Sequence, residues 1–171
     1  PDFDLDLMRP GQALNAVAGA VFRELDPLLE RLRPDWLLVQ GDTTTAMAAG
    51  FAAFHRRVRV GHVEAGLRTG DLEQPFPEEA NRTVIDVLAS ALFAPTAQAV
   101  DSLRAAGIPA PRVFLTGNTV VDALAWARQL PAGPAKNDAL VNIASQWAAS
   151  AAAAAADFAT RLPAGEQRTG V

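Results

Sequence analysis

Two kinds of hydrophobic pattern alternate along the chain and predict alternating helices and strands. From Gln12 to Arg33, apolar side chains recur mostly at three- and four-residue steps, which predicts an amphipathic helix that ends near Pro34. Residues 36–39 instead form a short continuous apolar run, typical of a strand buried on both faces of a parallel sheet. Similar signals predict strands at residues 58–63, 91–94 and 113–115 and helices at residues 43–55, 77–90, 97–106 and 120–130.

This regular exchange of strands and helices predicts an α/β fold. We expect an open parallel sheet with helices on both faces, joined by right-handed crossovers. In such sheets, ligands bind outside the carboxyl ends of the strands. The loops that follow Val39, Val63, Ala94 and Leu115 all belong to that edge, so we expect a functional site there.

The last part of the chain has a different character. Residues 131–171 are rich in alanine, with six in a row from Ala151 to Ala156, and they carry few charges. Alanine favours helix, but the segment lacks a strong apolar stripe with which to dock one. We therefore divide the chain into a folded part, residues 1–130, and a tail, residues 131–171, with a marginal helix between flexible ends.

Composition narrows the functional classes. The chain has 171 residues, half of them hydrophobic, which is ordinary for a globular protein with a sizeable core. Its net charge of −4 gives no excess of basic residues for binding nucleic acid. The absence of cysteine excludes disulfides and thiolate chemistry, and two histidines do not suffice for a histidine metal cage. No apolar run approaches the ~18 residues that a membrane span needs, so a cytoplasmic enzyme is the default.

Ionisable side chains gather at the expected functional edge. Asp42 lies at a strand-to-helix turn, where capping of the helix is the commonest role of an aspartate. Thr43 and Thr44 follow it, and their hydroxyls suit either helix capping or contacts with phosphate and sugar groups. The sequence leaves the capping and ligand-binding interpretations of these residues open.

Glu64 follows the second predicted strand directly. A carboxylate at the end of a buried strand is expected to be partly desolvated, which raises its pKa and suits acid/base chemistry. The simpler alternative is a salt bridge from Glu64 to Arg68. His62 either orients a partner or satisfies a backbone carbonyl, and a single histidine decides little.

Further charged residues open the third predicted helix. Glu78 falls in its first turn, where acidic residues favour the helix dipole without any catalytic role. Arg68 and Arg82 are candidates to hold a carboxylate or to bind a phosphate through two hydrogen bonds. Each residue taken singly favours a structural role, and only their combination points to a site.

That combination extends over most of the chain. Polar and turn-forming blocks follow one another at Pro1–Leu5, Pro10–Gln12, Gly41–Thr45, Gly61–Asp71, Pro75–Arg82, Phe93–Thr96 and Thr116–Leu124. In their order and spacing, from Pro1 to about Leu130, these blocks resemble the non-hydrolysing UDP-N-acetylglucosamine 2-epimerases. Gln40 stands where that family often has histidine.

The resemblance implies a partial Rossmann-like N-terminal domain of a glycosyltransferase-B-type fold, with the active site in a cleft between two domains. It implies reversible inversion at C2, which interconverts UDP-N-acetylglucosamine and UDP-N-acetylmannosamine through elimination and re-addition of UDP. By motif position, Asp42, Glu64 and Glu78 match the family's acid/base or intermediate-stabilising carboxylates. His62, Arg68, Thr43, Thr44, Arg82 and Asn118 are expected to bind the substrate.

The same resemblance sets expectations about partners and extent. It implies no metal or nicotinamide cofactor, and it implies a homodimer when the protein is full length. We expect the family's first strand and basic loop to precede Pro1 and its second domain to follow Leu130. Because half a cleft supplies half the ligands, we expect this chain alone to bind UDP very weakly.

Three functional alternatives remain at this stage. The first is the reversible epimerase, an enzyme of cell-surface polysaccharide biosynthesis. The second is a hydrolysing epimerase that releases free N-acetylmannosamine. The third is a non-catalytic remnant or an interaction module that uses an uncovered sheet edge or apolar face.

Overall fold

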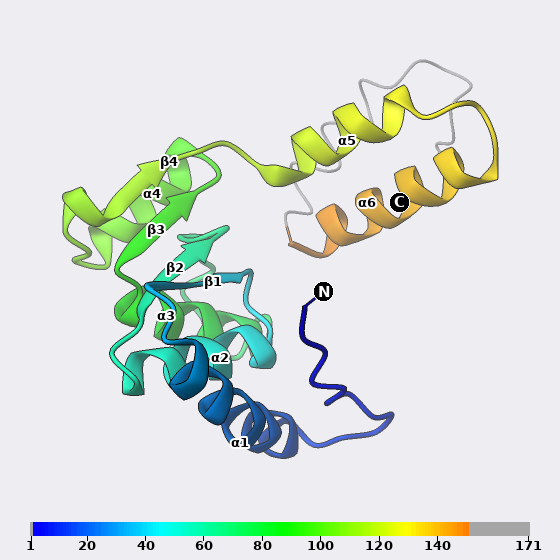
Figure 1. Cartoon of the computed structure of the whole chain (residues 1–171). Coiled ribbons are helices and arrows are strands. Elements are labelled where there is room, and N and C mark those ends of the chain that lie inside the picture. The colour runs from blue at the N-terminus through cyan, green and yellow to red at the C-terminus, as the bar shows by residue number, and fades with distance from the viewer. Residues whose placement is uncertain (1, 151–171) are drawn as a thin grey trace. The chain divides into compact units, whose positions relative to one another are not determined.

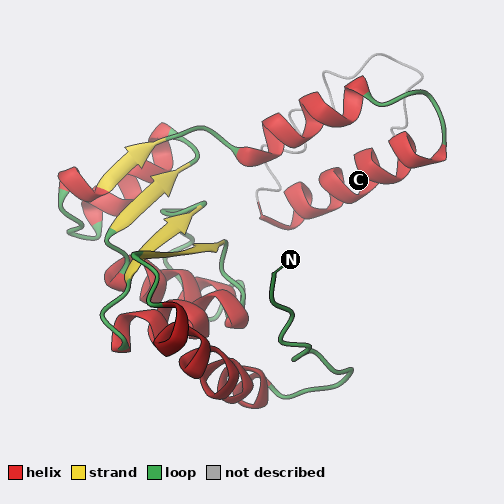
Figure 2. Ribbon diagram, in the orientation of Figure 1, coloured by secondary structure: helices red, strands yellow, loops and turns green. Residues whose placement is uncertain are grey.

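The computed structural model describes residues 2–150, and their side chains except those of residue 142 and residues 144–150. The chain divides into two compact units, the first ending at Gly117 and the second beginning at Asn118. The strands shown in Figures 1 and 2 belong to the first unit, and helices α5 and α6 belong to the second.

The observed elements follow the sequence prediction closely. In the first unit they are α1 (Leu14–Leu32), β1 (Trp36–Gln40), α2 (Thr44–His55), β2 (Arg59–Val63), α3 (Glu78–Leu88), β3 (Ala91–Ala94), α4 (Ala97–Ala105), the 3-10 turn η1 (Ala110–Arg112) and β4 (Val113–Leu115). The second unit contains α5 (Thr119–Gln129) and α6 (Pro134–Ser150). Every strand and helix predicted up to residue 130 is confirmed to within two residues at each end.

The strands form one parallel sheet in the order β1-β2-β3-β4. Its register pairs Val39 with His62, His62 with Leu92, and Leu92 with Val113. The predicted α/β fold with an open parallel sheet is therefore confirmed. Because successive strands are added in one direction and crossovers share one hand, α2, α3 and α4 return over the same face.

One hydrophobic core lies between that face and the helices. Alternate strand residues enter it, namely Val39, Val60 and Leu92, and they meet buried side chains from each of the four helices of the unit. These helix residues include Leu29 of α1, Ala52 of α2, Ile85 of α3 and Leu103 of α4. Ile85, Leu92 and Leu103 are fully buried, so this single layer supplies the hydrophobic stabilisation of the unit.

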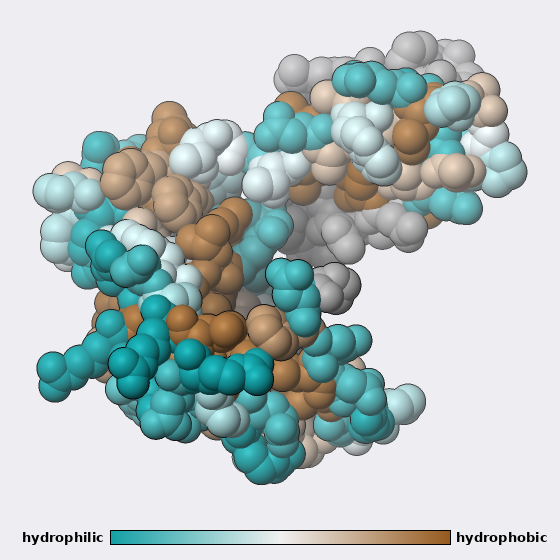
Figure 3. All heavy atoms as spheres, in the orientation of Figure 1, coloured by the Kyte–Doolittle hydropathy of each residue, from teal (hydrophilic) through white to brown (hydrophobic). Residues whose placement is uncertain are grey.

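The opposite face of the sheet carries exposed apolar side chains. Trp36 is 40% exposed, Leu38 63% and Phe114 47%, and the rings of Phe93 and Phe114 lie 5.8 Å apart. The expectation that residues 36–39 are buried on both faces is wrong for this structure, and residues 2–117 supply no helix layer on the second face. Figure 3 shows apolar surface, in brown, in the region of these strands.

The second unit is a helical hairpin. Helix α5 buries Leu124 and Ala127, and the Lys136 ammonium at the start of α6 donates to the Arg128 carbonyl at 2.9 Å. A helix therefore forms over residues 134–150 of the predicted tail. The alanine run 151–156 and the expected flexible end, residues 163–171, lie outside the described residues. The division of the chain at residue 130 stays a prediction.

The helices within residues 2–150 can be compared with the dimensions of a bilayer. None of these helices combines the length and the apolar character that crossing a bilayer requires.

The close packing of α4 against the end of β2 depends on Gly66. Its φ is +84°, and a Cβ there would lie 2.4 Å from the Ala99 carbonyl oxygen and 2.8 Å from the Leu103 Cγ. Gly70 has a similar φ of +80° but open space around it. We expect Gly70→Ala to lower the free energy of unfolding by about 1–2 kcal/mol through backbone strain alone. Gly66→Ala should cost a further 1–3 kcal/mol or so, because a helix must move.

Urea unfolding of the two variants beside the parent chain measures this difference. Equal losses in the two variants would contradict the assignment of Gly66 to close packing.

Candidate active site

The turn after β1 places Asp42 at the carboxyl edge of the sheet. Gly41 has a φ of +69°, and its N–H donates to the Val63 carbonyl at 3.0 Å, which ties the turn to the end of β2. Helix α2 is capped by the next residue, Thr43, whose hydroxyl accepts from the Ala46 N–H at 3.1 Å. The capping interpretation of Asp42 is therefore wrong, and its carboxylate remains available for other contacts.

Asp42 is partly buried beside a buried arginine. Its Oδ2 lies 2.8 Å from Nη2 of Arg82, with side-chain exposures of 24% for Asp42 and 9% for Arg82. Burial raises the pKa of Asp42, and nearby Glu78 raises it further, while the charges of Arg82 and His62 oppose the rise. The Asn81 amide also donates to the Asp42 carbonyl at 2.9 Å, which fixes the backbone of the turn.

Glu64 directly follows β2 and has a left-handed backbone conformation. Its φ is +66°, an uncommon value for a residue other than glycine, and such strain clusters at functional sites. Its carboxylate is close to the Asp42 turn, because Oε2 lies 3.7 Å from the place of a Cβ on Gly41. Among the described residues, no hydrogen bond or ion pair engages this carboxylate. The salt-bridge alternative to Arg68 is therefore wrong.

Glu78 brings a third carboxylate to the same edge. It is half-buried in the first turn of α3, and its charge contributes to the raised pKa of Asp42, so the two groups lie within electrostatic reach. No hydrogen bond to its side chain occurs within the described part of the chain. Acid groups with differing environments thus converge from the β1–α2 turn, the end of β2 and the start of α3.

The loop between β2 and α3 is held by Glu79. This residue is 2% exposed, and its carboxylate accepts from the backbone N–H groups of Thr69 at 3.1 Å and Gly70 at 3.2 Å. Arg82 Nε lies 3.6 Å from the same carboxylate. No sequence pattern distinguishes Glu79, since an acidic residue in the first turn of a helix is explained by the helix dipole alone.

A second buried polar cluster lies beneath the carboxylates. His62 is fully buried, with Nδ1 2.5 Å from Asp86 Oδ1 and Nε2 2.9 Å from the Gly41 carbonyl oxygen. Arg68 donates to the other Asp86 oxygen and to the Leu67 carbonyl. The sequence alternative in which His62 satisfies a backbone carbonyl is confirmed. Asp86 went unnoticed because its position in α3 carries no motif.

The remaining candidates are dispersed. Thr44 lies close to Asn81, with 3.5 Å between the hydroxyl and the amide nitrogen. Arg68 and Arg82 already pair with carboxylates of the protein. Asn118 belongs to the second unit, where its side chain caps α5 by accepting from the Val120 N–H at 2.9 Å. The structure thus gathers Asp42, Glu64, Glu78 and their supporting residues at one edge.

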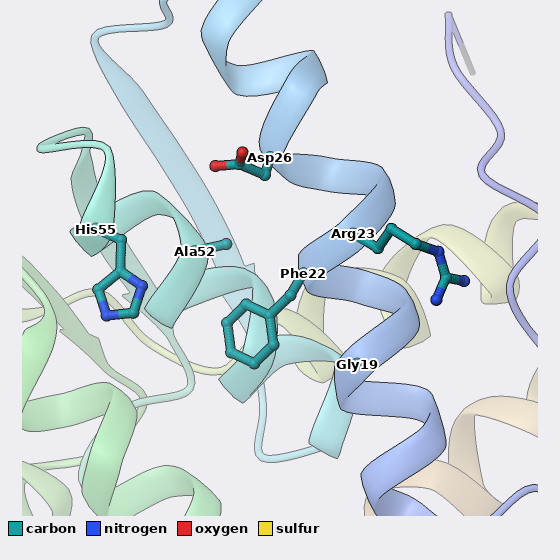
Figure 4. Close-up of a pocket in the computed structure, with 6 residues that line it drawn as sticks. All are labelled: Gly19, Phe22, Arg23, Asp26, Ala52 and His55. Carbon is teal, nitrogen blue, oxygen red and sulfur yellow. The ribbon is translucent and has the colours of Figure 1, made fainter.

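Two other features lie apart from these residues. A groove of about 490 Å³ opens between α1 and α2 and is lined by Phe22, Asp26 and His55 (Figure 4), at the end of α2 opposite to Asp42. Within the described residues, no cluster of three or more histidine, aspartate or glutamate side chains has the arrangement of a metal site.

Comparison with known proteins shows to which family this chain belongs. Residues 1–151 match the family model described as UDP-N-acetylglucosamine 2-epimerase. The chain belongs to this family. The resemblance seen in the motifs is therefore confirmed, as is the relation of the fold to the known structures of such epimerases.

Individual relatives give the extent of the likeness. The UDP-N-acetylglucosamine 2-epimerase of Yersinia pestis is 53% identical over 128 residues, which are 75% of this chain and 34% of that protein. The protein of the same name from Escherichia coli K12 is 51% identical with the same coverage. The chain thus spans about a third of the length of these curated relatives.

Solved structures agree with this picture. The Neisseria meningitidis UDP-GlcNAc 2-epimerase bound to UDP-GlcNAc has a TM-score of 0.72 and 46% identity, over 75% of this chain and 34% of that one. A structure of a UDP-N-acetylglucosamine 2-epimerase homologue from Listeria monocytogenes gives a TM-score of 0.75 and 44% identity, over 78% and 35%. The fold that carries these carboxylates is therefore that of the epimerase family.

The pKa of Asp42 generates a prediction about stability. Burial raises this pKa above 3.8, the value of an ordinary aspartate. At a pH between 3.8 and the raised pKa, Asp42 therefore holds more protons in the folded state than in the unfolded chain. Stability therefore falls as pH rises through this interval. Asp42→Asn removes that titration. Urea unfolding measures the free energy of unfolding of the Asp42→Asn variant and of the parent chain. We expect the value for the variant minus the value for the parent to become more positive from pH 3.5 to pH 7. If this difference instead becomes smaller as pH rises, the pKa of Asp42 is not raised.

Proposed function

We propose that this chain forms the acid/base half of the active site of an enzyme that interconverts UDP-N-acetylglucosamine and UDP-N-acetylmannosamine. Family membership supports this proposal, as do relatives named for that epimerisation and a relative bound to UDP-GlcNAc. The observation that carries it is the meeting of Asp42, Glu64 and Glu78 at one sheet edge, two of them without a neutralising partner in the described residues.

Inversion at C2 requires a proton to leave one face of the sugar and return to the other. A carboxylate removes the C2 proton, the C1–O bond to UDP breaks, and the bonding electrons leave on the phosphate oxygen. The product is a glycal with a double bond between C1 and C2. Re-addition of UDP at C1, with protonation of C2 from the opposite face, gives the epimer. Two acid/base groups on different sides of the ring perform this exchange better than one.

The environments of the carboxylates suit different parts of this cycle. Asp42 has a raised pKa, so it retains a proton to higher pH than an ordinary aspartate and is suited to donation. Glu64 lacks a partner in the described residues and stands on a strained backbone, which fits a group that exchanges protons with a ligand. Glu78 adds negative charge near Asp42 and is proposed to share the acid/base work.

The basic residues are proposed to act close to these carboxylates. Arg82 is nearly buried and balances Asp42 and Glu79, so it sets the charge of the site. Arg68 is paired with Asp86 and remains 16% exposed. Thr43 and Thr44 are proposed to offer hydroxyls to the sugar or phosphate, and Asn118 stays a predicted substrate-binding residue. Direct contact of His62 with substrate disagrees with its complete burial.

Two alternatives involve the same residues. A hydrolysing epimerase would add water instead of UDP at C1 and release free N-acetylmannosamine. A non-catalytic remnant would keep the fold without turnover, and the exposed apolar side chains Trp36 and Leu38 favour an interaction role in that case. We also propose, from the family resemblance, that the full-length protein is a cytoplasmic homodimer.

The test uses the polypeptide encoded by the complete reading frame that contains this chain. Incubated in D₂O with UDP-N-acetylglucosamine, it should form UDP-N-acetylmannosamine with deuterium at C2, followed by ¹H and ³¹P NMR. Free N-acetylmannosamine would favour the hydrolysing enzyme instead. Absence of both products would overturn the proposal and favour the non-catalytic alternative.

Single substitutions assign the carboxylates. We expect Glu64→Gln and Glu78→Gln to lower kcat about 10²–10⁴-fold, because each removes a group that transfers protons. Asp101→Asn on α4 is the matched control, since Asp101 is an exposed carboxylate apart from the site. Circular dichroism checks that each variant keeps its fold. Activity within a few-fold of the parent in both glutamine variants would remove Glu64 and Glu78 from the chemistry.

A further inference from the structure

One buried carboxylate connects the two loops that carry the proposed acid/base residues. Asp86, on α3, is 1% exposed, and each of its oxygens contacts a different partner. Oδ1 binds His62, whose ring reaches the carbonyl of Gly41 just before Asp42. Oδ2 binds Arg68, which lies in the loop that follows Glu64 and also donates to the Leu67 carbonyl.

The chemistry of the Gly41 contact fixes one hydrogen of the ring. The Gly41 carbonyl can only accept, so Nε2 of His62 must carry a hydrogen. Nδ1 of the same ring contacts one Asp86 oxygen, and Arg68 donates to the other, so Asp86 joins the histidine to the loop that carries Arg68. The ring also lies close enough to Asp42 for its charged form to oppose the rise that burial imposes on the pKa of Asp42.

The turn that carries Asp42 depends on this ring. Gly41 has both backbone polar groups occupied by β2, its N–H by the Val63 carbonyl and its carbonyl by the His62 side chain. Without the His62 bond, the turn would be held only by the Gly41 N–H and by the Asn81 bond to the Asp42 carbonyl. Glycine has the widest backbone freedom of any residue, so the Gly41 end of the turn could then shift. A shift of about 1 Å at a catalytic group can lower turnover about 100-fold.

We propose that Asp86 is a positioning residue: it orients His62 so that Nε2 clamps the Gly41 carbonyl and thereby places Asp42 against Glu64. The inference rests on the proposed function, because it concerns the carboxylates of that reaction. It assigns a role to Asp86, whose two carboxyl oxygens both contact protein side chains, and it gives fully buried His62 a role other than contact with a ligand.

The matched pair His62→Gln and His62→Asn tests the clamp. The glutamine amide nitrogen falls near the position of Nε2 and can still donate to Gly41, whereas the asparagine nitrogen falls near Nδ1 and reaches only Asp86. We expect kcat of His62→Asn to be at least about tenfold below that of His62→Gln, with little difference in KM. A purely structural role predicts instead that kcat follows the free energy of unfolding. The free energy of unfolding of His62→Gln should fall by as much as that of His62→Asn, because the glutamine leaves an Asp86 oxygen without its partner.

A second measurement needs no activity. In ¹⁵N NMR spectra of the polypeptide encoded by the complete reading frame, Nε2 of His62 should carry a hydrogen, because the Gly41 carbonyl can only accept. Asp86→Asn should speed the exchange of that hydrogen with solvent, because the ring loses the carboxylate that orients it. A parent protein in which Nε2 carries no hydrogen would overturn the proposed hydrogen bonding, even if Asp86→Asn does not fold.

The outcomes separate the two proposals. An active parent enzyme with equal kcat in both His62 variants overturns the positioning role and leaves the epimerase proposal intact. A parent enzyme without turnover overturns the proposed function and the catalytic part of this inference, while the NMR spectra still decide the hydrogen bonding. The proposal is supported when Nε2 of His62 carries a hydrogen and kcat of His62→Asn falls below that of His62→Gln.

Discussion

The contact between α3 and β2 is made through charge as well as apolar packing, and the arrangement of the sheet edge depends on it. Asp86 and His62 are almost completely buried in the layer that also contains Ile85 and Leu92. Burying one such group alone is strongly unfavourable, and leaving one without its partner costs several kcal/mol. Here the carboxylate meets an arginine and an imidazole, and the imidazole meets a carbonyl. Helix α3 can therefore occupy only the position at which all these bonds are made together.

Arginine has an analogous role nearer the surface. Arg82 lies among Asp42, Glu79 and the Glu78 carbonyl, so a single guanidinium organises the start of α3 and the turn after β1. Glu79 in turn holds the loop after β2 through two backbone N–H groups. The acidic groups at this edge thus form two classes. Asp86 and Glu79 are engaged by the protein, while the side chains of Glu64 and Glu78 have no hydrogen bond or ion pair within the described part of the chain.

Sequence reasoning was accurate where a local pattern sufficed. Strand and helix positions followed from apolar periodicity, and the gathering of Asp42, Glu64 and Glu78 at the carboxyl edge of the sheet followed from the strand ends. It was less accurate where distant residues decide the outcome. Nothing local to Asp42 reveals that Thr43 caps the helix, and nothing local to Arg68 reveals that its partner is Asp86 rather than Glu64. Burial of residues 36–39 on both faces was overestimated, because periodicity cannot tell which face other elements cover.

The left-handed backbone of Glu64 has a consequence for what the position tolerates. Aspartate and asparagine adopt this conformation more readily than glutamate does, and glycine more readily still. The chain nevertheless places the longer acid there, and its carboxylate extends as far as Gly41 on the neighbouring turn. At this residue the chain therefore has the side chain that extends further, and not the one that adopts a positive φ more easily. Shortening the side chain by one methylene would relax the backbone and would also withdraw the carboxylate from the neighbouring turn. Local stability and the reach of the carboxylate therefore favour different residues at position 64.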